Sequence, residues 1–75
     1  MNTGNDFKYE IKEKLAVLSQ DGDNTLEANM ISYNGYKPKL DIRKWDRKEN
    51  KLLKGITLSD NEAQALYDVL KKKYA

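Results

Sequence analysis

The sequence predicts an α+β fold in which a four-stranded antiparallel sheet is followed by one C-terminal helix, in the order ββββα. Three observations support this prediction: apolar and polar residues alternate along the first part of the chain, turn-forming residues separate four such segments, and residues 59–74 have a helical pattern. The chain has 75 residues, which is room for one domain. We expect residues 1–6 to form a flexible tail and residues 7–75 to form the domain.

The first strand is expected over residues 7–19. Its apolar residues share one parity and most of its charged residues share the other, which is the period-2 pattern of a half-buried strand. The apolar set is Phe7, Tyr9, Ile11, Leu15 and Val17. Glu13 interrupts this set and favours a bulge or a strong twist at that point. The turn-forming segment QDGDN then separates the first strand from the second.

The second and third strands form a predicted hairpin around Asn34-Gly35, a strong signal for a tight turn. In the second strand, Leu26, Ala28 and Met30 alternate with Glu27, Asn29, Ile31 and Tyr33. In the third strand, PKLDIRKW, we expect Leu40 and Ile42 to face the core. The opposite face, which we expect to be open to solvent, consists of Lys37, Lys39, Asp41, Arg43 and Trp45.

The fourth strand, LLKGITL, contains Gly55, which indicates a bulge or a close approach of two backbones. The helix that follows has a capping box, because Glu62 lies three residues after Ser59. Acidic residues near its start and three lysines near its end suit the helix dipole. Its apolar stripe consists of Ala63, Leu66, Tyr67, Leu70 and Tyr74.

A single helix cannot cover both faces of a four-stranded sheet. A chain this short also buries only about 60% of its unfolded surface, so its core is marginal. Disulfides are excluded because the chain has no Cys, and a structural zinc site is disfavoured because it also has no His. Oligomerisation therefore remains as the expected source of further stability, and the uncovered face must meet water, a ligand or a second subunit.

Positive charge is concentrated in one segment. Residues 36–55 contain eight Lys or Arg against three Asp or Glu, a net charge of +5, whereas residues 1–35 contain three Lys against six Asp or Glu, a net charge of −3. Such asymmetry indicates a polyanionic partner, although a solvated Lys-rich face is the alternative.

The predicted outward row of the third strand suits single-stranded nucleic acid. Cations such as Arg43 neutralise phosphates, and an exposed Trp45 offers a stacking surface for an unpaired base. Tyr33 and Tyr36, on either side of the hairpin turn, would extend that surface. The alternatives left open by the sequence are a core position for Trp45, a pairing of Arg43 with Asp41 or Glu49, and ordinary hairpin roles for the two tyrosines.

Catalysis has little support. The chain lacks the commonest general base and the thiol nucleophile, and it has no Gly-rich phosphate loop. We therefore expect no enzyme activity, no cofactor and no metal. We expect a cytoplasmic protein without membrane association, because neither a signal peptide nor an apolar stretch of membrane-spanning length is present.

The stretch LDIRKW, followed by KGITLSDNE, resembles the signature of the transcriptional positive cofactor 4 family. That signature is a D-I-R-x-aromatic strand, a charged turn, and K-G-I-[ST]-L before the final helix. The similarity is greatest to the short bacterial, YdbC-like branch. It extends from about Phe7 to Tyr74 and is strongest from Lys39 to Glu62.

The resemblance implies a curved four-stranded sheet, a symmetric dimer, and binding of single-stranded DNA with little sequence preference, in transcription, replication or repair. By position, Arg43 matches the phosphate-binding Arg of the family and Trp45 matches the aromatic end of that strand. Lys54 matches the Lys before Gly-Ile-[ST]-Leu, and Lys37 matches a basic position just before the third strand.

Three departures from the family pattern put the identity of the stacking residues in question. Leu53 replaces the first of two basic residues, and the aromatic pair after the Arg becomes Lys44 and Trp45, with a shorter turn after it. Asn34 stands where an aromatic residue is expected, flanked by Tyr33 and Tyr36. Two rival functions also stay open at the level of the sequence: a regulator that binds double-stranded DNA, and a protein-interaction module that uses the exposed sheet.

Overall fold

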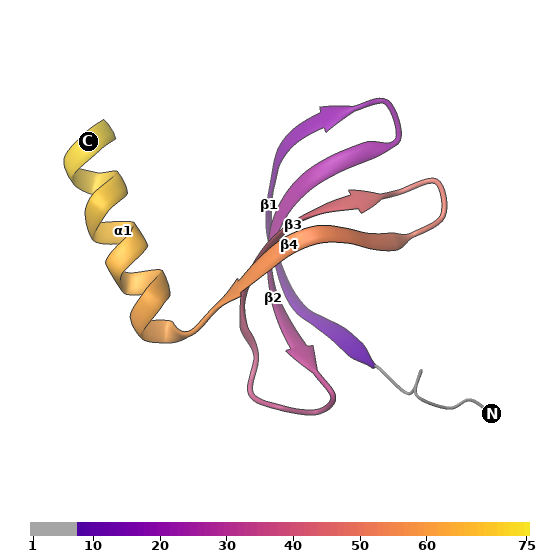
Figure 1. The fold of residues 1–75 in the computed structure, drawn as a ribbon, viewed down its shortest axis with the longest axis horizontal. Coiled ribbons are helices and arrows are strands. Elements are labelled where there is room, and N and C mark those ends of the chain that lie inside the picture. Colours follow the sequence, from indigo (N-terminus) through magenta and orange to yellow (C-terminus); the bar gives the residue numbers. More distant parts are fainter. Residues whose placement is uncertain (1–7) are drawn as a thin grey trace.

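The computed structural model describes residues 8–75, which form one antiparallel sheet and one helix (Figure 1). The strands are β1 (Tyr9–Asp21), β2 (Asn24–Tyr33), β3 (Lys39–Asp46) and β4 (Lys51–Leu58), in the spatial order β1-β2-β3-β4, and the helix is α1 (Asp60–Tyr74). The predicted ββββα order is confirmed. The predicted tail and Phe7 lie outside the described residues.

The hairpin turns follow the chemistry that the sequence indicates. Asn34 and Gly35 both have positive φ, 52° and 80°, as the tight turn between β2 and β3 requires. Gly22, in the turn between β1 and β2, has φ of 62°. These residue types tolerate left-handed backbone conformations, so both turns form with little strain.

Strand β1 differs most from its prediction. Its pairing with β2 shifts register three times, between Ile11 and Glu13, between Lys14 and Ala16, and between Val17 and Ser19. Each shift adds an unpaired residue and bends the strand, so the simple alternation of faces is lost. The bulge expected near Glu13 is confirmed. The expected half-buried apolar face is wrong, because Val17 is 59% exposed and only Ile11 is even partly buried.

The sheet has an enclosed face and an open face, and their assignment reverses the prediction. Apart from Ser32, the buried residues of β2 and β3 lie on what we call the inner face, whose members are Thr25, Glu27, Asn29, Ile31, Asp41 and Trp45. Leu40 and Ile42, which were expected to form the core, lie on the outer face and are only half-buried. The ribbon of β1 and β2 bends strongly in Figure 1, and we attribute the burial of the inner face to this curvature.

Gly55 confirms the predicted close approach. It pairs with Arg43 across β3 and β4, and a β-carbon at this position would lie 1.9 Å from Cβ of Arg43 and 2.7 Å from its Cα. Any other residue would therefore clash with the backbone of β3. The register then shifts, so that Leu53 and Lys54 together lie opposite Lys44.

Helix α1 begins as predicted but packs little. Ser59 accepts a hydrogen bond from the backbone of Glu62 and the Glu62 side chain accepts one from the backbone of Ser59, which completes the capping box. The helix extends away from the sheet (Figure 1), and it has no buried residue. Its stripe residues Tyr67, Leu70 and Tyr74 are 56%, 45% and 78% exposed.

Candidate nucleic-acid interface

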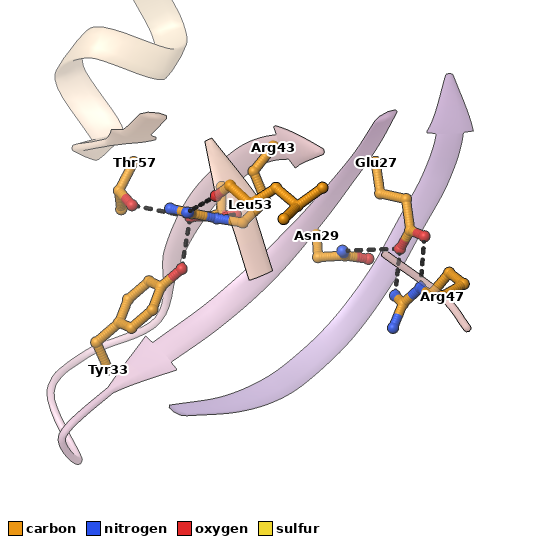
Figure 2. Close-up of polar contacts among 8 residues, drawn as sticks. Glu27, Asn29, Tyr33, Arg43, Arg47, Leu53 and Thr57 are labelled. Carbon is orange, nitrogen blue, oxygen red and sulfur yellow. Dashed lines mark hydrogen bonds and ion pairs between the residues drawn. The ribbon is translucent and has the colours of Figure 1, made fainter. Parts of the chain in front are cut away.

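The side chain of Arg43 is fixed by a buried carboxylate on its own strand. Asp41 is fully buried and accepts hydrogen bonds from Nε and Nη2 of Arg43 at 2.7 and 2.8 Å. Tyr33 and Thr57 donate to the same carboxylate, at 2.7 and 2.9 Å, and Nη1 of Arg43 donates to the carbonyl of Leu53 at 2.9 Å (Figure 2). The sequence left the partner of Arg43 open, and the structure identifies it as Asp41.

This network changes the ionisation of its members. Burial alone would raise the pKa of Asp41, but the hydrogen bonds from Arg43, Tyr33 and Thr57 outweigh it and hold the pKa below its usual value. Burial and the hydrogen bond to Asp41 raise the pKa of Tyr33 to about 12. Asp41 is therefore a carboxylate at neutral pH, and Arg43 is a rigid, locally neutralised cation with a side chain that is 15% exposed.

Four of the predicted binding residues gather in one pocket beside this network. The pocket has a volume of about 190 Å³ and is lined by Ile31, Tyr33, Tyr36, Lys37, Lys39 and Thr57. Tyr36 is 74% exposed, while its backbone is held by hydrogen bonds to Tyr33 and Ser32. The β2–β3 hairpin thus presents aromatic rings and ammonium groups together, the combination that single-stranded nucleic acid uses.

The expectation that Trp45 is an exposed stacking surface is wrong. Trp45 is fully buried on the inner face, and its Nε1 has no hydrogen-bond partner within the described part of the chain. Tyr9 packs against it edge to face, with ring centroids 5.8 Å apart. The guanidinium of Arg47 lies over the indole ring, 4.2 Å from its centroid. Parity assigned Trp45 to the same face as Arg43, which is right, but the curvature of the sheet closes that face around the ring.

Arg47 is held in place by a second buried carboxylate. Its Nε and Nη2 donate to the two oxygens of Glu27, at 2.8 and 2.6 Å, and Asn29 donates to the same carboxylate at 3.4 Å (Figure 2). The Glu27 side chain is 7% exposed and that of Arg47 is 30% exposed. The hydrogen bonds from Arg47 are the main reason that the pKa of Glu27 falls to about 2.

Most cations of the basic segment are lysines without a carboxylate partner. Of the eight, Lys37 pairs with Asp60 at 3.1 Å, and Arg43 and Arg47 pair with buried carboxylates. Within residues 8–75, the other five make no ion pair: Lys39, Lys44, Lys48, Lys51 and Lys54. Lys54, a predicted site residue, lies in the β4 bulge opposite Lys44 and outside the hairpin pocket.

Sequence reasoning missed Glu27 and Arg47. Glu27 lies outside the signature that carries the family resemblance, and Arg47 lies in the charged turn of that signature, where no individual residue is assigned a role. One signal was present: Glu27 stands among Asn29, Ile31 and Tyr33 on one parity of β2, and a carboxylate on a partly apolar face needs a cationic partner. The register places Glu27 directly opposite Arg43, yet its bonded partner is Arg47 from the turn after β3.

Comparison with known proteins supports a family assignment. The family model of the transcriptional coactivator p15 (PC4) matches residues 21–69, which is more than half of the chain. The chain belongs to this family. A relative described as an uncharacterized protein from Treponema pallidum (strain Nichols) is 42% identical over 66 residues, which cover 87% of this chain and 78% of the relative.

Membership of the PC4 family gives a nucleic-acid-binding function related to transcription, and the proteins of this family bind DNA and are not enzymes. Among residues 8–75, no three carboxylates gather as a metal site, and no helix is long and apolar enough to span a membrane. The matched region includes β2, β3, β4 and most of α1, and therefore all of the hairpin pocket and both arginine–carboxylate pairs.

Proposed function

We propose that this protein binds single-stranded DNA with little sequence preference, in the transiently opened duplex of transcription, replication or repair. The observation that carries the proposal is the hairpin pocket, where Tyr33 and Tyr36 lie beside Lys37 and Lys39. Unpaired bases expose π-faces that can stack on such rings, whereas the bases of a duplex are already stacked. We also propose that the chain belongs to the short bacterial branch of the family, a proposal with which its similarity to a Treponema pallidum protein agrees.

Phosphate binding is assigned mainly to the lysines that lack carboxylate partners. Lys39 and Lys54 each bring a positive charge that forms no ion pair within residues 8–75, so contact with a phosphate releases a counterion. Arg43 has a different role, because Asp41 already balances its charge. Its two remaining N–H groups are preorganised to hydrogen-bond one phosphate, with little change in the salt dependence of binding.

The binding unit is proposed to be a homodimer. The outer face of the sheet carries Leu26, Ala28, Met30, Leu40 and Ile42, none of which is fully buried, and Ile56 on β4 is 55% exposed. The apolar stripe of α1 is also uncovered. Burial of these two surfaces against a second copy supplies the hydrophobic contact that a chain of this size lacks alone.

Titration of labelled dT oligonucleotides and a matched duplex tests the proposal. We expect tighter binding of the single strand, and we expect Lys39→Ala and Lys54→Ala each to reduce the log–log salt slope by about 0.7 if each lysine contacts one phosphate. Preferential binding of duplex would support a double-stranded DNA regulator instead. Weak binding that does not depend on oligonucleotide length would favour a protein-interaction module.

A further inference from the structure

We propose that Arg47, and not the buried Trp45, is the surface on which a nucleobase stacks at the far end of β3 from the hairpin pocket. The proposal rests on the single-stranded DNA binding proposed above and adds a second base site to it. Arg47 lies in the turn after β3, in a part of the basic segment to which neither the family signature nor the sequence patterns assigned a role.

The geometry around Arg47 leaves one surface of the guanidinium available. One face lies over the indole of Trp45, with Cζ 4.2 Å from the ring centroid. Hydrogen bonds to Glu27 and a longer one to Asn50, at 3.5 Å, use N–H groups that lie in the guanidinium plane. The side chain nevertheless remains 30% exposed. We infer that the exposed part is the face of the planar group that is turned away from the indole, and that this face is the one available to a ligand.

Stacking suits this arrangement better than phosphate binding. Glu27 accepts two hydrogen bonds from Arg47 and neutralises its charge, so an added phosphate would compete with a buried carboxylate. A base requires only the flat face, and guanidinium planes are established stacking partners of unpaired bases. Trp45 below and Glu27 at the edge hold the plane still, so little conformational freedom is lost when the base binds.

The hairpin pocket and Arg47 lie at opposite ends of the same strand. Lys39 of the pocket is the first residue of β3 and Arg47 follows its last residue, Asp46. The buried carboxylates Asp41 and Glu27 each anchor one arginine, and Figure 2 shows the two arginines, Arg43 and Arg47. A single strand that lies along β3 would thus meet aromatic rings at one end and a guanidinium platform at the other.

The test compares two oligonucleotides of equal length: dT, and a strand that keeps its phosphates but lacks bases at alternate positions. Arg47→Lys keeps the charge next to Glu27 but removes the planar face. We expect this variant to bind dT about tenfold more weakly, with an unchanged salt slope, and to bind the base-depleted strand as the unchanged protein does. Lys48→Gln is the matched control, because it removes an exposed charge from the same turn and should weaken both complexes alike.

A second variant guards against a structural artefact. The double change Glu27→Gln/Arg47→Met removes both charges together, so that no buried carboxylate is left unpaired, and it should show the same loss that is specific to bases. Urea unfolding of each variant verifies that it is folded. If the Arg47 variants bound both oligonucleotides more weakly by the same factor and with a reduced salt slope, or bound both as the unchanged protein does, the proposal that a base stacks on Arg47 would be overturned. If the unchanged protein itself failed to bind dT, the proposed function would fail along with it.

Discussion

The Glu27–Arg47 pair predicts how the stability of the protein depends on pH. The pKa of Glu27 lies near 2 in the folded protein, against an ordinary value of 4.5. The folded state therefore binds fewer protons than the unfolded state between these values. The contribution of the ionised Glu27 carboxylate to stability is complete above about pH 4.5 and is lost as the pH falls to about 2.

The size of this contribution follows from the shift. A change of about 2.5 pKa units, from 4.5 to about 2, corresponds to about 3 kcal/mol at most. Glu27→Gln mimics the protonated carboxyl at every pH. We expect this variant to be less stable than the unchanged protein by up to that amount at pH 7, and the difference to vanish as the pH approaches 2.

Urea unfolding at a fixed protein concentration, over a series of pH values, measures the effect. Glu10→Gln is the control, because Glu10 pairs with Lys12 at the surface, where its side chain is 69% exposed, and such pairs contribute little. Asp41 also has a lowered pKa, so its protonation in acid destabilises the folded state as well. This loss occurs both in the unchanged protein and in Glu27→Gln, so it does not contribute to the difference between them. A constant difference between Glu27→Gln and the unchanged protein from pH 7 to pH 2 would refute the reasoning.

Three further changes test the packing and the assembly. Gly55→Ala should cost about 1–3 kcal/mol or more and weaken DNA binding, because the new methyl group meets the backbone of Arg43; urea unfolding with wild-type stability would contradict the close approach. Trp45→Ala should lower the free energy of unfolding by about 3–5 kcal/mol and leave the chain largely unfolded by circular dichroism. A variant that stays folded and loses only DNA binding would show that Trp45 is exposed and not part of the core. Leu70→Glu should shift the proposed dimer to monomer in sedimentation experiments; an unchanged mass would place the interface elsewhere.

The order of elements could be predicted from local signals. The turn at Asn34-Gly35, the cap at Ser59 and the constraint at Gly55 each depend on residues close in sequence or on one backbone contact, and each is present in the structure. Which face of the sheet is buried was harder to predict. Alternation identified the two faces of β2 and β3 correctly, but it could not say which of them the sheet encloses.

The curvature of the sheet determines which face is enclosed, and this curvature arises from bulges that the alternation of apolar and polar residues does not reveal. Three bulges in β1 bend the sheet, so that a face containing Glu27, Asn29 and Asp41 becomes the buried one. Polar residues on an interior face are tolerated because Arg43 and Arg47 satisfy the carboxylates. Because the curvature encloses the polar face, the apolar residues of the outer face, which the sequence predicts to be the core, need another surface to bury them.

The central claim is that the basic, aromatic surface takes single-stranded DNA in preference to duplex. Its most direct test is a fluorescence anisotropy titration of dT against a matched duplex at several salt concentrations. The account predicts preferential binding of dT, with a log–log salt slope near −4 if about six phosphates are contacted. Equal affinity for the two forms, or a slope near zero for dT, would contradict it.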